Sequence, residues 1–401
     1  MLKIFPRENY VKKITPYFGK NIIKVLTGQR RCGKSYLLRL IQNAIKIKSP
    51  DINIIYIDKE KVAFDHIQEY KDLFAYVVQN TIADQMNVVM VDEIQEIESF
   101  EKAIRDLNED DQYDVYCTGS NANLLSGNLA TLLAGRYIEI NVSSLSYNEF
   151  IAFHQFEHSM DTLKKYLKFG GMPYLVNLPL EEDIISEYLG SLYNSIILKD
   201  VVARNNIRNI NFLERLLLFL ADNTGNLLTA KNISDYLKSQ KVSMSINTVL
   251  NYLKALEDAF IIHRVSRYDI IGKKRFEVND KYYFEDVGIR NNIIGFQQQD
   301  IGKTLENIVF KHLWIKGYDI YVGKYQNLEI DFVAQKTGKT IYIQVAYLLP
   351  SQETRDREFG NLLKIKDNHR KIVVSMDEFA QGSIDGVEHL HILDFLCDAE
   401  A

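Results

Sequence analysis

The apolar positions of the first 150 residues fall into short continuous runs separated by longer stretches with helical spacing. The short runs are rich in β-branched residues and predict strands at Ile22–Thr27, Ile52–Ile57, Val88–Asp92, Asp114–Thr118 and Tyr137–Val142. The stretches with helical spacing include Glu69–Asp84 and Ser99–Asp106. Strands and helices that alternate in this way predict a parallel sheet covered by helices on both faces.

Beyond Phe150 the alternation stops and two further patterns follow. Helices are expected at Asp161–Lys168 and Leu180–Ile197, with a turn at Gly170-Gly171-Met172-Pro173 between them. Further helices are then expected at Arg215–Ala221, at Thr229–Leu237 and from Ser245 onward, followed by strands at Phe260–Arg267 and Arg275–Phe284. Three helices and a β-hairpin predict a winged helix-turn-helix.

The last part of the chain predicts one helix, three strands, a second helix and a fourth strand. These elements are Lys303–Lys316, Asp319–Val322, Leu328–Ala334, Thr340–Ala346, Arg355–Lys366 and Lys371–Ser375. The patterns together predict an α/β protein with four regions, at residues 1–150, 151–211, 212–286 and 287–401.

Composition narrows the class of protein. A chain of 401 residues is longer than one ordinary core, and 46% hydrophobic and 25% charged residues are typical of a soluble globular protein. No apolar run approaches the ~20 residues of a membrane span, and the segment MLKIFPRENY lacks the apolar core of a signal peptide. Cys32, Cys117 and Cys397 are scattered and indicate neither a zinc site nor a disulfide framework. We therefore expect a cytoplasmic protein without a membrane partner.

The segment Gly28–Ser35 carries the clearest chemical signal. Its sequence GQRRCGKS fits G-x-x-x-x-G-K-[ST] and lies between a predicted strand and a predicted helix. Such a loop turns backbone N–H groups and a helix N-terminus toward an anion. Lys34 is then expected to contact the β- and γ-phosphates of a nucleotide, and Ser35 to bind Mg²⁺. The expected nucleotide-binding residues are Gly28, Gln29, Arg30, Arg31, Cys32, Gly33, Lys34, Ser35 and Tyr36.

Two adjacent carboxylates, Asp92 and Glu93, lie at the end of the predicted strand Val88–Asp92. Four consecutive apolar residues predict a strand buried on both faces, and open α/β sheets bind ligands at the carboxyl ends of their strands. Asp92 is expected to hold Mg²⁺, directly or through water. Glu93 is expected to polarise the water that attacks the γ-phosphate, as general base or as water positioner. The two motifs together predict a nucleotide hydrolase.

Further candidate residues lie near the ends of other strands. Ser120 and Asn121 follow the strand that ends at Thr118. Either Ser120 or Asn121 senses the γ-phosphate, or a helix begins here with a cap at Asn121 or Asn123. Arg136 precedes the last strand of the region. It either stabilises charge on the transferred phosphoryl group, in its own chain or from a neighbouring subunit, or forms a salt bridge at the start of the strand.

The ordered set of motifs resembles the prokaryotic AAA-type ATPases that carry a C-terminal domain of unknown function. The resemblance covers nearly the whole chain and rests on the segments Thr27–Ser35, Val91–Gln95, Thr118–Ala122, Gly135-Arg136, Leu145–Phe150, Phe169–Pro173, Leu198–Val201, Lys281–Gly288 and Leu305–Val309. It implies a nucleotide-dependent, oligomeric ATPase that uses ATP and Mg²⁺, with Arg136 as a finger acting in trans. The region 151–211 resembles the helical lid of such proteins, where Arg204 or Arg208 is either a second phosphate sensor or a surface arginine.

The predicted winged helix leaves two kinds of partner open. Residues 225–275 hold nine Lys/Arg against four Asp/Glu in a chain whose formal net charge is −5, which suits phosphate contacts. The third helix, however, has a Ser- and Asn-rich polar face and ends in Glu257-Asp258, and winged helices also bind proteins. The partner is therefore DNA or a protein.

The last region resembles the PD-(D/E)xK nuclease superfamily, which clusters carboxylates and a lysine around Mg²⁺. Glu306, Glu329 and Asp331 match the acidic positions, but Gln344-Val345-Ala346 stands where acid-x-Lys is expected. Ala346 cannot replace an ammonium, and Lys339 or Lys364 would have to substitute from elsewhere. We therefore predict that this region binds its partner without cutting nucleic acid.

The sequence as a whole predicts an ATPase that hydrolyses ATP to ADP and phosphate and is coupled to a partner bound by its C-terminal regions. The alternatives are a nucleotide-gated DNA- or protein-binding scaffold with slow turnover, and an ATP-driven nuclease. The intact pair Asp92-Glu93 favours hydrolysis over a pure scaffold, and Ala346 counts against the nuclease.

Overall fold

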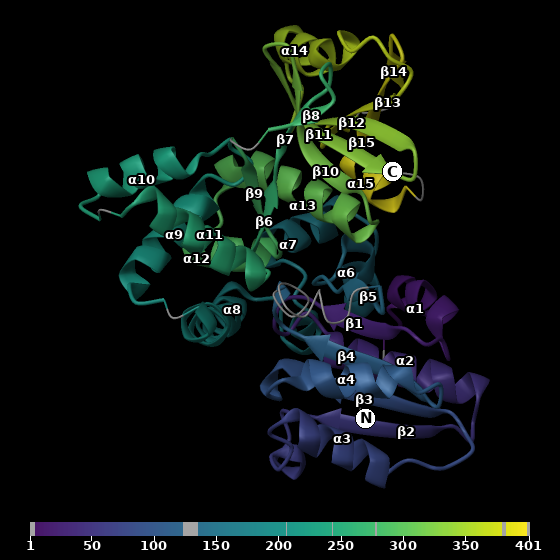
Figure 1. Cartoon of the computed structure of the whole chain (residues 1–401). Helices are drawn as coiled ribbons and strands as arrows, with labels where there is room; N and C mark the ends of the chain where they lie inside the picture. The colour runs from purple at the N-terminus through teal and green to yellow at the C-terminus, as the bar shows by residue number, and fades with distance from the viewer. Residues whose placement is uncertain are drawn as a thin grey trace. The chain divides into compact units, whose positions relative to one another are not determined.

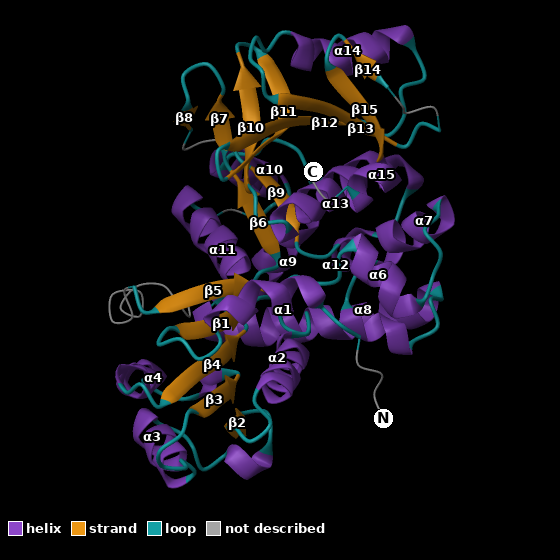
Figure 2. Cartoon of the chain, turned by 90° about the vertical axis from the view of Figure 1, so that its right-hand side faces the viewer, coloured by secondary structure: helices purple, strands orange, loops and turns teal. Residues whose placement is uncertain are grey.

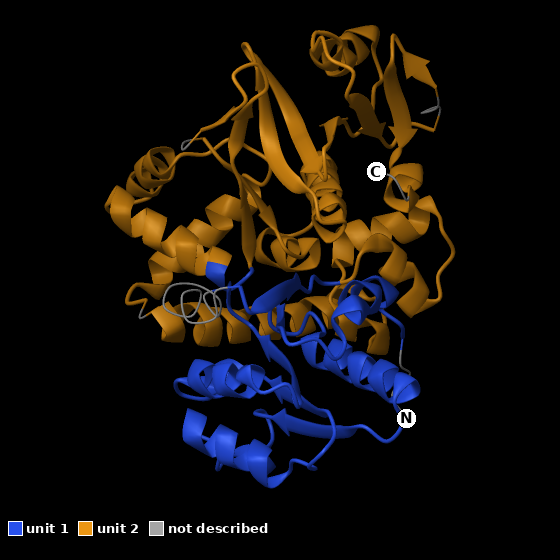
Figure 3. Ribbon diagram, turned by 45° about the vertical axis from the view of Figure 1, so that its right-hand side comes forward, with its two compact units in different colours: residues 1–144, 258–260 blue, residues 145–257, 261–401 orange. Residues whose placement is uncertain are grey.

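The computed structural model describes residues 5–122, 135–205, 207–242, 244–276, 279–378 and 382–398. The chain forms two compact units, one of residues 1–144 with 258–260 and the other of residues 145–257 with 261–401 (Figure 3). Each unit has its own sheet and its own buried apolar cluster. The finer division into four regions remains a prediction.

The first unit is built on a five-stranded parallel sheet with the strand order β2-β3-β4-β1-β5 (Figure 1). Its strands are β1 Ile23–Thr27, β2 Asn53–Asp58, β3 Asn87–Asp92, β4 Tyr113–Gly119 and β5 Tyr137–Asn141. Its helices are α1 Glu8–Ile14, α2 Lys34–Lys48, α3 Tyr70–Gln79 and α4 Phe100–Glu109, with short 3-10 turns η1 Thr15–Tyr17, η2 Val62–Phe64 and η3 Ile94–Glu96.

Helices cover both faces of this sheet, because successive side chains of a strand point to opposite faces (Figure 2). In β3, Val89 and Val91 pack into the cluster formed with α3 and α4. Val88 and Met90 of the same strand pack into the cluster formed with α1 and α2. All six residues of β3 are buried, as expected of a strand whose continuous apolar run is covered on both faces of the sheet. The predicted parallel α/β core is confirmed.

The second unit begins with helices and contains the elements of the predicted winged helix. The helices and helical turns are α6 Tyr147–His154, α7 Met160–Phe169, η5 Pro173–Asn177, α8 Glu182–Ile196, η6 Ile197–Ala203, α9 Ile210–Asp222, α10 Ala230–Ser239, α11 Ile246–Asp258 and α12 Val287–Ile294. Strands β6 Ile262–Val265 and β9 Lys281–Phe284 pair antiparallel. The turn at Gly170-Gly171 is packed by Asp286, whose Oδ2 accepts a hydrogen bond from the Gly171 N–H at 2.8 Å.

The far part of the predicted hairpin differs from the expectation. Strands β7 Arg267–Asp269 and β8 Lys274–Arg275 leave the β6–β9 pair and extend the C-terminal sheet, where β7 pairs parallel with β10 (Figure 1). The Arg275 guanidinium lies 4.6 Å from the ring centroid of Tyr321. This part of the wing therefore forms the edge of another sheet, where both residues of β8 are exposed.

The C-terminal sheet has eight strands in the order β14-β15-β13-β12-β11-β10-β7-β8. The remaining elements are η7 Gln298–Asp300, α13 Ile301–Ile315, β10 Asp319–Tyr325, β11 Leu328–Lys336, β12 Lys339–Val345, α14 Gln352–Leu363, β13 Arg370–Ser375, β14 Ser383–Ile384, β15 Val387–His391 and α15 Ile392–Cys397. β10, β11 and β12 form an antiparallel meander and β13 runs parallel to β12. The predicted order of helices and strands in this region is confirmed.

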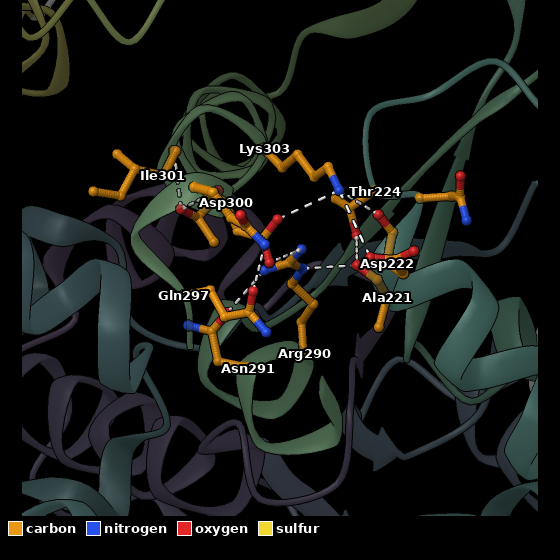
Figure 4. Close-up of polar contacts among 12 residues, drawn as sticks. Ala221, Asp222, Thr224, Arg290, Asn291, Gln297, Asp300, Ile301 and Lys303 are labelled. Atoms are coloured by element: carbon orange, nitrogen blue, oxygen red, sulfur yellow. Dashed lines mark hydrogen bonds and ion pairs between the residues drawn. The ribbon is translucent and has the colours of Figure 1, made fainter. Parts of the chain in front are cut away.

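A buried arginine joins three helices of the second unit (Figure 4). Arg290 of α12 is fully buried; its Nε donates to the Ala221 carbonyl at 2.9 Å and its Nη1 to Asn291 Oδ1 at 3.1 Å. Asp300, at the start of α13, lies 3.4 Å from Nη2. Burial lowers the pKa of Arg290, and Asp300 opposes that shift. The hydrogen bond and the ion pair hold α12 against the ends of α9 and α13.

Candidate functional site

The loop between β1 and α2 has a backbone that side chains would disturb. A Cβ on Gly28 would lie 2.1 Å from the carbonyl oxygen of Val142, so glycine is required for this close approach. Gly33 has φ 101° and precedes Lys34, the first residue of α2. The loop therefore passes directly into a helix N-terminus, which is the arrangement that binds phosphate.

The side chain of Lys34 folds back over its own loop. Its Nζ donates to the carbonyl oxygens of Gly28 at 3.0 Å and Gln29 at 3.1 Å. The same ammonium lies 3.7 Å from Glu93 Oε1, and only 3% of Lys34 is exposed. The predicted phosphate-binding lysine and the predicted water-activating glutamate are thus brought together.

Thr118 of β4 connects the two carboxylates that end β3. Its Oγ1 donates to Asp92 Oδ1 at 2.6 Å and accepts the Glu93 N–H at 2.9 Å. Since β4 lies between β1 and β3, the threonine is placed between the loop strand and the acidic strand. Ser35 forms a side-chain hydrogen bond with Asp92, so the predicted pair of Mg²⁺ ligands is also in contact.

The two adjacent acids have different electrostatic surroundings. Burial raises the pKa of Asp92 above its ordinary value, against the effect of the Thr118 hydroxyl. Burial acts on Glu93 in the same direction, but the Lys34 ammonium and the Gln95 amide outweigh it and lower the pKa of that carboxyl. Glu93 also has φ 55°, a left-handed conformation that is uncommon outside glycine. Glu93 is therefore held as an anion in a strained backbone conformation directly after β3.

The remaining residues predicted from the sequence lie either directly after β4 or around the loop between β1 and α2. Ser120 is buried and hydrogen-bonds Glu93, whereas Asn121 is half-buried beside it in the chain. Around the loop, Arg30 lies 3.6 Å from Glu60, Arg31 is exposed and Cys32 is buried; Tyr36 is half-buried and accepts the Phe5 N–H. The helix cap considered at Asn123 lies outside the described residues.

Arg136 is exposed and its Nη1 lies 2.5 Å from Glu109 Oε1, in its own unit. The salt bridge considered from the sequence is therefore present, and the finger in trans remains a prediction. Arg208 is exposed, and Arg204 pairs with Asp200 at 3.2 Å within the second unit. Their role as a second phosphate sensor also remains a prediction.

Sequence reasoning missed an arginine that supports the loop from outside. Arg7 is buried, and its Nη1 and Nη2 donate to the carbonyl oxygens of Cys32 at 3.1 Å and Ser143 at 3.0 Å. Its guanidinium lies 4.5 Å from the ring centroid of Tyr10. An arginine this far ahead of the motif gives no local signal, because its partners are distant in sequence.

Comparison with known proteins agrees with this geometry. A family model described as an AAA domain matches residues 20–151, and one for a domain of unknown function matches residues 160–300. An uncharacterised protein of Haemophilus influenzae is 36% identical to 97% of this chain and 98% of its own length. An uncharacterised protein of Methanocaldococcus jannaschii is 30% identical over 97% of this chain and 89% of its own length.

The chain belongs to this family of AAA-domain proteins. A Walker-type ATPase of Pyrococcus abyssi has a similar structure, with a TM-score of 0.51 and 17% identity over 72% of this chain and 96% of its own. At that identity the likeness shows the fold. No helix in the described part of the chain is long and apolar enough to cross a membrane.

The side chains of the AAA domain fit a magnesium nucleotide. A hydroxyl on Ser35 and a carboxylate on Asp92 are hard oxygen donors that Mg²⁺ prefers, and they already touch each other. Asp92 is a buried acid with a raised pKa, so a divalent cation beside it would stabilise its charged form. The ammonium of Lys34 and the N-terminus of α2 supply positive charge for phosphates.

The acids predicted in the C-terminal region also lie together, but with an unexpected companion. Glu306, Glu329 and Asp331 surround Lys281, at 2.9, 2.9 and 3.1 Å from its Nζ. Ala346 leaves no ammonium at the expected lysine position, but a lysine from elsewhere does reach the acids: it comes from β9 rather than from the end of β12. Lys339 and Lys364, the substitutes considered, are both exposed.

Proposed function

We propose that this AAA-domain protein is a cytoplasmic ATPase that binds Mg²⁺ and ATP at Gly28–Ser35 and hydrolyses ATP to ADP and phosphate. The observation that carries the proposal is the convergence of Lys34, Asp92 and Glu93 at one edge of the parallel sheet, with Thr118 joining the two acids. Each of these side chains has the chemical type that its role requires.

The roles follow from the contacts. The backbone N–H groups of the loop would cradle the phosphates, and Lys34 would exchange the carbonyl oxygens of Gly28 and Gln29 for phosphate oxygens. Ser35 and Asp92 would hold Mg²⁺, which neutralises charge on the phosphates when bound. Glu93, whose pKa is lowered, would orient the attacking water and accept its proton, while Ser120 fixes the carboxylate.

The test uses a pair of charge-neutralising substitutions on one segment. Glu93→Gln should keep ATP binding and abolish most hydrolysis, because the amide cannot accept the proton. Glu98→Gln is the matched control. Glu98 is exposed on the same segment, so this variant should hydrolyse ATP at the wild-type rate. Lys34→Ala should instead weaken binding. Hydrolysis at the wild-type rate in Glu93→Gln would show that the assigned role is wrong.

We further propose that hydrolysis is coupled to a partner held by the second unit. The outward face of α11 combines Asn247, Asn251 and Lys254 with the apolar residues Ile246 and Leu250, all exposed. Amides and a lysine suit DNA, whereas the apolar pair suits a protein. β7 and β8 belong to the C-terminal sheet, but Lys273, Lys274 and Arg275 are exposed, so this part of the basic wing also suits phosphate contacts.

A nucleotide-gated scaffold with slow turnover is the second candidate, and this mixed face of α11 is the observation that favours it. Duplex DNA should be titrated against the protein with and without ATP, at two salt concentrations. Binding that depends on ATP and falls steeply with salt supports DNA as the partner. Binding that is undetectable at low salt in both nucleotide states favours a protein partner.

A further inference from the structure

Lys281 is the first residue of β9 and lies at the centre of a four-residue ionic cluster. Its Nζ is 2.9 Å from Glu306 Oε1 of α13, 2.9 Å from Glu329 Oε1 and 3.1 Å from Asp331 Oδ1, both of β11. Only 2% of Lys281 is exposed. The ammonium thus donates hydrogen bonds to Glu306 and Asp331 and forms an ion pair with Glu329, so its three carboxylate partners come from two separate elements.

Other groups around the cluster hold these carboxylates in place. The Tyr283 hydroxyl donates to Glu306 Oε1 at 2.6 Å, so this oxygen accepts hydrogen bonds from Lys281 and from Tyr283, both of β9. Asp331 Oδ2 accepts the Val345 N–H at 2.9 Å. The oxygens that face the centre are therefore committed to donors within the chain.

The arrangement does not fit the divalent metal that a PD-(D/E)xK-like fold implies. A magnesium ion would need carboxylate oxygens at about 2.0–2.1 Å, with room for several waters. Here the Lys281 ammonium lies between the carboxylate oxygens, at 2.9–3.1 Å from all three, and so occupies the space that a metal would need. Within the described ranges, no group of three His, Cys, Asp or Glu residues is arranged to hold a metal.

We propose that Lys281 is the resident cation of this cluster: its ammonium takes the place of a divalent metal, closes the site to metal ions, and clamps β9 to α13 and β11. The chain thereby keeps the acidic positions of a nuclease-like fold and uses them for an internal ionic contact. The absence of cleavage predicted from Ala346 then has a different cause, since the positive group is present and fills the site.

Electrostatics supports the clamp. Burial alone would lower the pKa of Lys281, but Glu306, Tyr283 and Asp331 outweigh burial and hold that pKa well above its ordinary value. Burial raises the pKa of Glu306 to about 7, against the effect of Lys281. An ammonium that stays charged while buried is stable only because the carboxylates surround it, and removing it would leave them unpaired.

The test counts bound Mn²⁺ by electron paramagnetic resonance, with nucleotide absent. Wild-type protein and Asp331→Asn should bind equal numbers of Mn²⁺, because the cluster takes no metal in either. Lys281→Met should bind one additional Mn²⁺, and Lys281→Met/Asp331→Asn should lose it or bind it at least about tenfold more weakly. Lys281→Arg is the matched control that keeps a cation in place and should gain no metal.

A contribution from the nucleotide site is common to all variants and cancels in the comparison. One Mn²⁺ more in wild-type protein than in Asp331→Asn would overturn the proposal, as would a folded Lys281→Met that gains none. Near-ultraviolet circular dichroism reports whether Lys281→Met is folded. If it is not, Lys281→Gln replaces it, and the comparison of wild-type with Asp331→Asn still decides whether the site is closed.

Discussion

Asp92 and Glu93 are neighbours in the chain whose pKa values shift in opposite directions. Asp92 faces hydroxyl groups and is affected most by burial, so its pKa is raised. Glu93 faces an ammonium and an amide, which outweigh its burial and lower its pKa. The proposed roles need this difference, because a metal ligand gains its counter-charge from the metal whereas a base must be anionic beforehand.

Thr118 is the residue whose loss should affect both acids together. Thr118→Val removes the hydroxyl that donates to Asp92 and accepts from the Glu93 N–H, with little change of shape. We expect a loss of about 1–3 kcal/mol of stability, because buried polar groups lose their partner, and a lower ATPase rate. Thr118→Ser keeps the hydroxyl and should retain most of both. Denaturant unfolding measures the stability, and phosphate release measures the ATPase rate. Equal ATPase rates in Thr118→Val and Thr118→Ser would contradict this positioning role.

Gln95 should set the pH at which hydrolysis fails in acid. Its amide donates to Glu93 Oε2 and favours the anion. An acid with a lowered pKa keeps its charge until the pH falls through that value. Gln95→Met removes the donor, so the pKa of Glu93 rises and activity is lost at a higher pH, by roughly half to one unit.

The measurement is the pH dependence of kcat on the acid side. Gln68→Met is the control, since Gln68 is an exposed glutamine outside the contacts to Glu93 and should leave the profile unchanged. Superimposable acid limbs for Gln95→Met and wild-type protein would sink the idea.

At the scale of elements, the sequence predicts well where a pattern is local. The strand expected at Val88–Asp92 is observed as β3, which begins one residue earlier. It could be predicted because its apolar run is buried on both faces. The loop, Ser35 and the acids of β3 could likewise be placed, since parallel strands end at the same edge of a sheet. Pairings between distant segments could not be placed. β7 leaves its hairpin for β10, and Lys281 meets Glu306 and Asp331 at separations of 25 and 50 residues.

The Gly170 turn should be among the least tolerant positions of the second unit. Gly170 has φ 75°, and a Cβ there would lie 2.1 Å from Asp286 Oδ1 and 2.5 Å from the Gly288 nitrogen. Gly170→Ala should therefore cost about 2 kcal/mol or more, through backbone strain and loss of the Asp286 contacts. Gly190→Ala is the matched control in α8, where the nearest atom is 3.5 Å away.

Gly190→Ala should raise the free energy of unfolding by up to about 1 kcal/mol, because alanine favours a helix more than glycine does. Thermal and urea unfolding of both variants measure the difference. Equal stability of Gly170→Ala and wild-type protein would mean that the turn adapts without its contacts to Asp286.

For the whole molecule, the open question is whether one chain suffices for turnover. Arg136 is exposed, and its salt bridge to Glu109 lies in the same unit, 2.5 Å between Nη1 and Oε1. An exposed ion pair contributes little to stability, so this contact alone gives no strong reason for an arginine here. An arginine that reaches the phosphates of a neighbouring subunit would instead lower the barrier to hydrolysis by neutralising charge.

Arg136→Ala should therefore reduce turnover by on the order of 10³-fold while leaving ATP affinity nearly intact, if the arginine acts in trans. Mixing Arg136→Ala with Glu93→Gln should restore part of the activity, because a hybrid interface then joins an intact arginine to an intact glutamate. Glu109→Gln is the control: it breaks the same salt bridge but leaves the guanidinium free to reach a neighbour. A loss in Glu109→Gln equal to that in Arg136→Ala, or full specific activity at a monomeric mass, would assign Arg136 to its own chain.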